Sequence, residues 1–199
     1  MKKLALISLP LAALMACQEA SAPASQPVAA ACTSRAYDNI GGPISMTDHT
    51  GARVTEEAYK GKKSLVYFGF TNCPDVCPFT LQTVAAAMDL MPENIEKPRT
   101  ILISVDPEAD TPEALSLYID SNGFPDDMVG LTGTPDEIRS AADNFKTTYN
   151  RIEDPSSTAG YTMDHVSILF LMSEDWKLET FFTSSSTPQD IASCLAALD

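Results

Sequence analysis

An apolar run that leads directly into two cysteines and a helix start constrains this chain more than any other feature. Residues 65–70 read Leu-Val-Tyr-Phe-Gly-Phe, which is typical of a central strand buried on both faces. The next segment is Thr71-Asn-Cys-Pro-Asp-Val-Cys-Pro78, and helical apolar spacing begins at Pro78. The sequence therefore predicts a strand, loop and helix unit whose loop holds Cys73 and Cys77. Two cysteines at this spacing can bind one soft metal ion or close one disulfide.

The pair Cys77-Pro78 has the pattern of a helix cap followed by the first helical residue. The same pattern recurs where a threonine hydroxyl can cap the first turn, at Thr111-Pro112, Thr134-Pro135 and Thr187-Pro188. We therefore expect Cys77 at a capping position, where the helix dipole favours the thiolate and lowers the thiol pKa from about 8.5. Cys73, one turn earlier, is expected on the same side of the loop.

The chain has two histidines from which a third ligand can come. His165 stands directly before the apolar run 166–172, at a strand entrance. His49 lies in the polar turn 47–51, and we expect it to be solvated. Taken alone, His165 would be interpreted as a hydrogen-bonded structural residue. Because the chain also contains the cysteine pair, we interpret it as a metal ligand. Thiolates select Cu(I), and imidazole binds copper in either oxidation state.

Strands and helices largely alternate along the chain, which predicts one α/β sandwich domain with a leading hairpin. Strands are expected at 44–46, 52–54, 64–70, 100–105, 128–131, 166–172 and 178–182. Helices are expected at 78–91, 112–121, 135–149 and 188–198. Their apolar stripes should include Met88 and Met91, which we interpret as packing residues together with Met172.

Three further segments carry expectations of their own. Asp106-Pro-Glu-Ala-Asp110 offers hard-metal ligands, but a turn leading to the Thr111 cap explains it more simply. Trp176 is expected at a hairpin tip, partly exposed. Residues 150–164 show no periodicity and lead to His165, so we expect a structureless loop that can move and let His165 close on a metal.

The N-terminus indicates export. Residues 1–16 have two lysines and a short apolar stretch, as in a secretory signal, and end in Leu14-Met-Ala-Cys17. This ending resembles the bacterial lipoprotein signal, which implies lipidation of Cys17. An ordinary signal cleaved after Ala22 is the alternative, but Pro23 disfavours it. Residues 17–34 are expected to form a flexible tether and 35–199 the domain. The protein is then expected on the periplasmic side of a bacterial membrane, with the inner membrane favoured.

The charge balance excludes two classes of partner. The chain carries a formal net charge of −14. Removal of the signal takes away two lysines and no acid, leaving 11 basic and 27 acidic residues, a net charge of −16. Such a surface argues against nucleic acid and against adsorption to anionic lipid. It suits a soluble periplasmic domain, and it is compatible with a basic partner.

The residues around the cysteines resemble the Sco/SenC family of copper proteins. The similarity covers C-x-x-x-C and the Asp164-His165 segment, and it extends through 42–51, 103–112 and 130–134. It implies a thioredoxin-like sandwich with a central mixed sheet, in which Cys73, Cys77 and His165 bind Cu(I) or Cu(II). It also implies assembly of cytochrome c oxidase, with oxidase subunit II or another copper chaperone as the partner.

Three function classes remain open. A copper chaperone would deliver the metal to the binuclear copper centre of the oxidase and would need His165. A thiol-disulfide reductase would keep the cysteines of the target reduced and would need only Cys73 and Cys77 as a redox-active pair. A peroxidase is disfavoured, because Thr71 lies two residues before Cys73 where peroxiredoxins have three.

The remaining cysteines are expected to pair. Cys194 lies on the apolar stripe of the last predicted helix, so a buried free thiol is one alternative. An oxidising compartment and the lack of another partner for Cys32 favour a disulfide between the two. Such a bridge would attach the end of the tether to the last helix.

Overall fold

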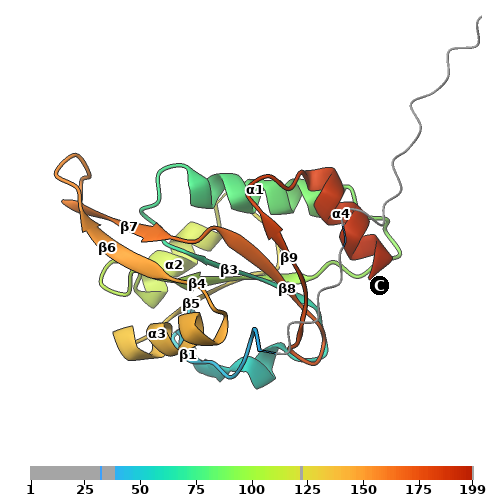
Figure 1. Ribbon diagram of the computed structural model, residues 1–199, viewed down its shortest axis with the longest axis horizontal. Helices are drawn as coiled ribbons and strands as arrows, with labels where there is room; N and C mark the ends of the chain where they lie inside the picture. The colour runs from blue at the N-terminus through green and yellow to red at the C-terminus, as the bar shows by residue number, and fades with distance from the viewer. Residues whose placement is uncertain (1–31, 33–38, 122, 199) are drawn as a thin grey trace, which may run out of the picture.

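The computed structural model describes residues 32, 39–121 and 123–198, and it is built around a seven-stranded mixed sheet in the order β2-β1-β5-β4-β3-β8-β9 (Figure 1). The strands of this sheet are β1 (Ser45–Asp48), β2 (Arg53–Thr55), β3 (Ser64–Gly69), β4 (Arg99–Ser104), β5 (Met128–Thr132), β8 (Ile168–Met172) and β9 (Leu178–Thr183). The helices are η2 (Glu56–Tyr59), α1 (Val76–Asp89), α2 (Pro112–Ile119), α3 (Pro135–Asn144) and α4 (Pro188–Ala197). The predicted thioredoxin-like α/β sandwich, its mixed sheet and its leading hairpin are confirmed.

Alternating side chains of the central strands assign the helices to the two faces of the sheet. Tyr67 and Phe68 are both buried and point to opposite faces. The Tyr67 hydroxyl lies 3.8 Å from the sulfur of Cys77 in α1, whereas the Phe68 ring packs at 5.4 Å against Phe145, directly after α3. Helices α1 and α4 therefore lie side by side on one face, and α3 lies on the other (Figure 1).

The three predicted threonine caps are confirmed. Thr111, Thr134 and Thr187 each accept a hydrogen bond from the backbone N–H three residues later, with a proline in the first turn. The predicted helix at 135–149 is too long, because α3 ends at Asn144. Lys146 takes the left-handed conformation, with φ of 53°, and reverses the chain toward the next strand.

Residues 150–164 form an ordered hairpin, so the expectation of a structureless loop is wrong. Strand β6 (Tyr149–Glu153) pairs antiparallel with β7 (Tyr161–His165) in a separate two-stranded sheet. Four of the five residues of β6 are exposed. Within β6 only Tyr149 is buried, and the strand therefore lacks the alternation of buried and exposed residues by which strands are recognised.

Trp176 is buried, which corrects the expectation that this residue of the hairpin tip is partly exposed. Only 6% of the residue is accessible, and its indole N–H donates to the Gly42 carbonyl at 2.9 Å. Its ring packs against Tyr59 and Phe145, at 5.9 and 6.2 Å between centroids. The tip folds back over the segment before β1, a contact that local turn signals do not encode.

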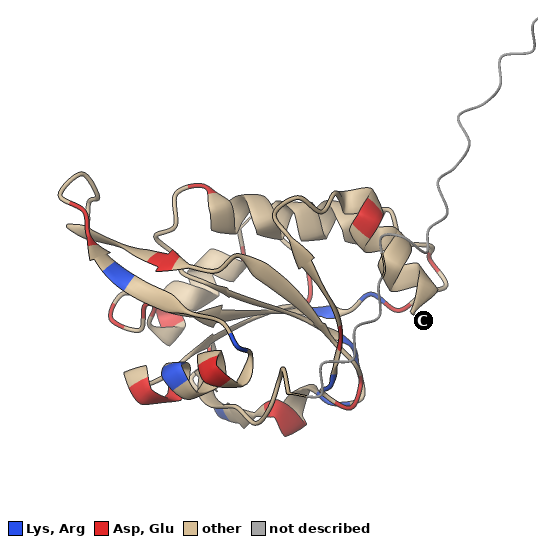
Figure 2. Cartoon of the chain, viewed as in Figure 1, with Lys and Arg blue, Asp and Glu red and all other residues tan. Residues whose placement is uncertain are grey.

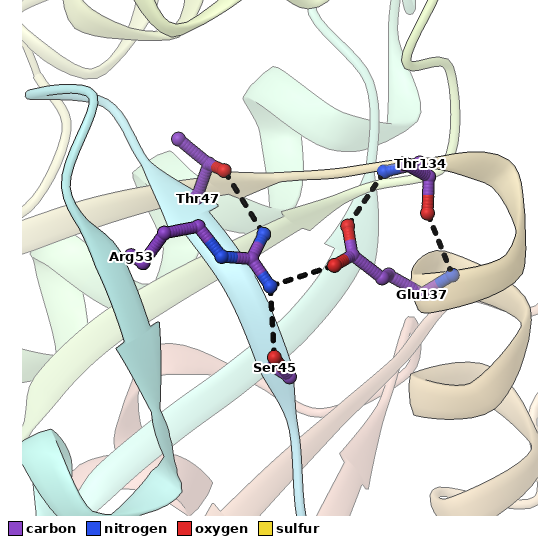
Figure 3. Close-up of polar contacts among 5 residues, drawn as sticks. All are labelled: Ser45, Thr47, Arg53, Thr134 and Glu137. Atoms are coloured by element: carbon purple, nitrogen blue, oxygen red, sulfur yellow. Dashed lines mark hydrogen bonds and ion pairs between the residues drawn. The ribbon is translucent and has the colours of Figure 1, made fainter.

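A polar cluster attaches the leading hairpin to α3 (Figure 3). The Arg53 guanidinium donates to the hydroxyls of Ser45 and Thr47 at 2.8 and 3.1 Å, and it pairs with Glu137 at 2.6 Å. Glu137 also accepts the backbone N–H of Thr134, which completes a capping box at the start of α3.

The predicted Cys32–Cys194 disulfide is present and joins residues 162 positions apart. Cys17, the signal at 1–16 and nearly all of the predicted tether at 17–34 lie outside the described residues. Within residues 32, 39–121 and 123–198, no helix is long and apolar enough to cross a membrane.

Candidate metal centre

Strand pairing brings the cysteine loop and His165 together. Strand β3 runs antiparallel to β8, with Tyr67 opposite Leu169. The chain that leaves the end of β3 therefore emerges beside the chain that enters β8. The first carries Cys73 and Cys77, and the second carries His165 as the last residue of β7.

The three candidate ligand atoms lie within 4.8 Å of one another. The Cys77 sulfur lies 3.6 Å from the His165 Nε2. Cys77 is fully buried, whereas Cys73 and His165 are partly exposed. Two sulfurs and one imidazole nitrogen at these separations suit a thiophilic ion such as Cu(I) or Zn²⁺ and do not suit Mg²⁺ or Ca²⁺.

The cysteines occupy different positions from those predicted. Helix α1 begins at Val76 with Asp75 before it, so Cys77 is the second helical residue and not the cap. The sulfur at the helix start belongs to Cys73, which accepts the backbone N–H of Cys77 at 3.3 Å. The prolines after both cysteines fit the loop and the first turn equally well, and the sequence pattern therefore leaves the helix start ambiguous.

This arrangement gives the two thiols opposite tendencies to ionise. The Cys77 thiol donates to the Cys73 sulfur and lowers the Cys73 pKa to about 4, with further contributions from His165 and the backbone N–H of Cys77. The Cys77 pKa is raised, because its proton is held by the Cys73 thiolate and because the residue is buried. Cys73 is thus the thiolate of the metal-free pair, and the thiolate predicted at Cys77 is corrected.

Gly69 allows the buried sulfur to lie against the end of β3. A β-carbon at this position would stand 3.0 Å from the Cys77 sulfur, 2.9 Å from the Tyr67 ring and 3.1 Å from Leu102. Both the Cys77 sulfur and the Tyr67 ring belong to the metal centre and its immediate surroundings, so a side chain at this position would disturb the site. A glycine inside an otherwise bulky strand is a sequence signal of close approach, but the sequence does not show what approaches.

Aromatic residues of β3 and its loop surround the imidazole, and we did not predict this role. The rings of Tyr67 and Phe70 meet the His165 ring edge to face, at 6.0 and 5.9 Å between centroids. The Tyr67 hydroxyl also lies 3.1 Å from the Ser167 hydroxyl, and burial raises its pKa. Tyr67 and Phe70 belong to the apolar run 65–70. Such a run predicts core packing, and it gives no sign that the two rings also contact a metal ligand.

The imidazole has a defined orientation. The His165 Nδ1 lies 3.4 Å from the Val166 carbonyl oxygen, and Nε2 is the nitrogen that faces the cysteines. A partner for the second ring nitrogen is the usual way in which a ligating histidine is oriented. Asp164, the residue before His165 on β7, is exposed.

The other sequence candidates lie elsewhere. His49 is partly buried, and its Nδ1 accepts the backbone N–H of Gly130 at 3.3 Å, so it is less solvated than expected. The segment from Asp106 to Asp110 forms the predicted turn before the Thr111 cap, and both of its aspartates are buried.

The fold and the site together define a thioredoxin-like protein with a centre of two cysteines and one histidine, placed where β3 passes into α1. The sequence matches the SCO1/SenC family over residues 33–198. The chain therefore belongs to the SCO1/SenC family.

Individual relatives agree with this assignment. Protein SCO1 homolog 1, mitochondrial, of Arabidopsis thaliana is 40% identical over 144 residues, which is 72% of this chain and 42% of the longer relative. The crystal structure of Arabidopsis thaliana ScoI with copper bound has a TM-score of 0.74 at 36% identity, covering 79% of this chain and 96% of that one. A structure of BsSco, described with a disulfide switch and as a member of the Sco family of cytochrome c oxidase assembly proteins, has a TM-score of 0.62 at 28% identity and covers 84% and 99%.

Proposed function

We propose that this protein is a copper chaperone, held on the periplasmic side of a bacterial membrane, that delivers copper to the binuclear copper centre of cytochrome c oxidase. The observation that carries the proposal is the convergence of Cys73, Cys77 and His165 within 4.8 Å. Copper is bound in the related Arabidopsis structure, and BsSco is described as a member of a family of oxidase assembly proteins.

The exposure of the ligands supports transfer of copper rather than permanent storage. Cys77 is buried, but Cys73 and His165 are partly accessible. A partner can therefore approach the metal from the side of Cys73 and His165, while Cys77 binds the metal from the buried side. Because a disulfide sulfur is a poor ligand, only the reduced pair can be loaded.

The surface beside the centre supports docking of a protein partner, for which oxidase subunit II or another copper chaperone is the proposal. Three apolar residues next to the ligands are unusually exposed: Val76 at 46%, Phe79 at 63% and Val166 at 40%. Asp75 and Asp164 are exposed among them. An apolar patch with an acidic border favours a partner with an apolar contact and basic residues around it.

The proposed anchor is the lipid on Cys17. Cys32 attaches the chain to α4 through its disulfide, and Figure 1 shows the end of α4 and the β6–β7 hairpin at opposite ends of the molecule. Figure 2 shows basic and acidic residues mixed at the end away from the hairpin. Near the beginnings of β3 and β4, Lys62 and Arg99 pair with Asp127, and Lys63 pairs with Glu179. A tether from Cys17 would therefore join the domain at the end away from the metal centre.

A thiol-disulfide reductase is the second candidate. The Cys73 thiolate beside a protonated Cys77 is the state from which a dithiol attacks a disulfide. In that function the pair would reduce the copper-site cysteines of the oxidase, and His165 would be dispensable.

Replacement of His165 separates the two functions. We expect the reduced wild-type protein to bind one copper and the form with a Cys73–Cys77 disulfide to bind far less. His165→Ala should weaken Cu(II) binding strongly and leave thiol exchange near normal. A chaperone carrying this change should fail to support oxidase assembly in cells at limiting copper.

The matched control is His49→Ala, which removes the other histidine and should bind copper like the wild type. If cells that express His165→Ala at native levels assembled the oxidase normally, the proposal of copper delivery would be wrong, and disulfide reduction would take its place. Equal copper retention by the oxidised and reduced forms would contradict the site itself.

A further inference from the structure

One turn contacts both segments that carry the candidate ligands. It runs from Asp106 to Asp110 between β4 and α2. Asp110 is fully buried, and its carboxylate accepts the Thr71 backbone N–H at 3.1 Å and the hydroxyls of Thr71 and Ser104 at 2.5 and 2.6 Å. Thr71 lies two residues before Cys73, so this aspartate fixes the start of the cysteine loop.

The other end of the same turn holds the hairpin of His165. The Asp106 carboxylate, only 3% exposed, accepts the Tyr161 hydroxyl at 2.9 and 3.1 Å. Tyr161 is the first residue of β7, and His165 is its last. A second contact reinforces the first, because the Arg151 guanidinium lies 3.6 Å from the centre of the Tyr161 ring and pairs with Glu108 at 2.6 Å.

The hairpin depends on these contacts more than a strand of the main sheet would. Strands β6 and β7 pair only with each other, outside the seven-stranded sheet. Tyr161, Met163 and His165 alternate along β7 and therefore point to one side, and Met163 between them is buried. Holding the Tyr161 end against the turn consequently sets the angle at which His165 meets the cysteines.

We infer that Tyr161 and Asp106 are positioning residues for His165, and that the turn from Asp106 to Asp110 fixes the separation between the histidine and the cysteine pair. Neither residue touches the metal centre. The inference rests on the proposed copper function and deepens it, because it names what holds the third ligand in place. Loss of the contact should affect the properties that require His165 and spare those that require only the cysteines.

Tyr161→Phe is the direct test, because it removes one hydroxyl and keeps the ring under Arg151. In the metal-free protein, we expect backbone amides of β7 to exchange with solvent about tenfold faster, as follows from losing a hydrogen bond to a buried carboxylate. In the loaded protein, we expect an altered visible and electron paramagnetic resonance spectrum of Cu(II) and about tenfold faster copper release to a chelator. Alkylation of Cys73 should stay within about twofold of the wild type.

Tyr149→Phe is the matched control. Tyr149 lies in β6 directly opposite His165, and within the described residues its hydroxyl makes no hydrogen bond, so its removal should change neither exchange nor the copper spectrum. Asp106→Ala removes the acceptor, so combining it with Tyr161→Phe should change copper release little more than either single change, since both remove the same contact.

The outcomes are decisive in either direction. Faster exchange in Tyr161→Phe with an unchanged Cu(II) spectrum and release rate would show a merely structural contact and overturn the inference. Unchanged exchange would overturn it as well. A wild-type protein that binds no copper would overturn the proposed function, and the exchange measurement on the metal-free protein would then still decide whether the contact holds the hairpin.

Discussion

The two cysteines of the centre lie four residues apart, yet they differ in chemistry because one is helical and buried and the other is not. Cys73 sits before α1 and receives hydrogen bonds, while Cys77 lies inside the first turn against Gly69. The exposed sulfur is therefore the nucleophile and the first contact for a partner. The buried sulfur becomes a ligand only when a metal ion displaces its proton.

At this scale we predict the pH dependence of thiol reactivity in the reduced, metal-free protein. With its pKa lowered to about 4, Cys73 is already thiolate at pH 6, so its alkylation by iodoacetamide should be nearly independent of pH from 6 to 8. Cys77 should react negligibly over that range, because its pKa is raised. Peptide mass spectrometry of quenched samples measures both rates.

Cys77→Ala provides the contrast, because it removes the largest cause of the lowered pKa. Cys73 in this variant should titrate at higher pH, and its alkylation rate should then rise between pH 6 and 8. A wild-type rate that rose tenfold per pH unit between 7 and 8 would contradict the assignment of the thiolate to Cys73.

Among the elements, the start of α3 combines a threonine cap with an ion pair to the leading hairpin (Figure 3). Thr134 caps the helix, and Glu137 contacts both Thr134 and Arg53. The hydrogen bond from Arg53 is the largest cause that lowers the Glu137 pKa from its ordinary value near 4.5. A carboxyl with a lowered pKa stabilises the fold above its unfolded pKa, and this stabilisation is lost as the pH falls through the folded pKa.

We predict that Thr134→Ala lowers the free energy of unfolding by about 1 kcal/mol at pH 7, measured by urea denaturation. Thr134→Ser, which keeps the hydroxyl, should remain near the wild type. Glu137→Gln should cost less than about 1 kcal/mol, because Arg53 is half exposed and solvent screens the pair. The difference between Glu137→Gln and the wild type should shrink from pH 7 to pH 3; a difference that grew would refute the role given to the ion pair.

On the scale of the whole molecule, the disulfide connects the first described residue to the last helix. Cys194 is fully buried on α4 and Cys32 is partly buried, and helix α4 packs beside α1, which carries Cys77. A crosslink across 162 positions restricts the unfolded chain far more than the folded one.

We predict that Cys32→Ala lowers the free energy of unfolding by about 2–4 kcal/mol without changing copper affinity. This variant leaves Cys194 in place as a buried apolar thiol, so the comparison isolates the crosslink from any cavity in α4. Urea denaturation and copper titration of the two proteins supply the measurements. Recovery of Cys32 in alkylated form from the unreduced wild-type protein would show that the bridge is absent in solution.

Much of the architecture was predictable from local patterns. Apolar runs identified β3, β4 and β8, because strands buried on both faces are predominantly apolar. Threonine and proline pairs located the starts of three helices, because the cap and the first turn are decided by a few adjacent residues. With two histidines in the chain, the spacing of the cysteines and the segment around His165 also sufficed to name the three candidate ligands.

Contacts between distant segments decided the rest. Local patterns do not reveal which cysteine lies inside the helix, what packs on Gly69, or that Trp176 packs against the segment before β1. The hairpin of His165 was missed because β6 is exposed at four of its five residues and because Met163 is the one buried residue of the short strand β7. The sequence by itself determined the strand, loop and helix that present the cysteines and the identity of the histidine. Only the tertiary structure decided which thiol is ionised and how the histidine is held, because ionisation depends on burial and on hydrogen-bond donors in space, and the hairpin is placed by Tyr161 reaching Asp106, 55 residues away in the chain.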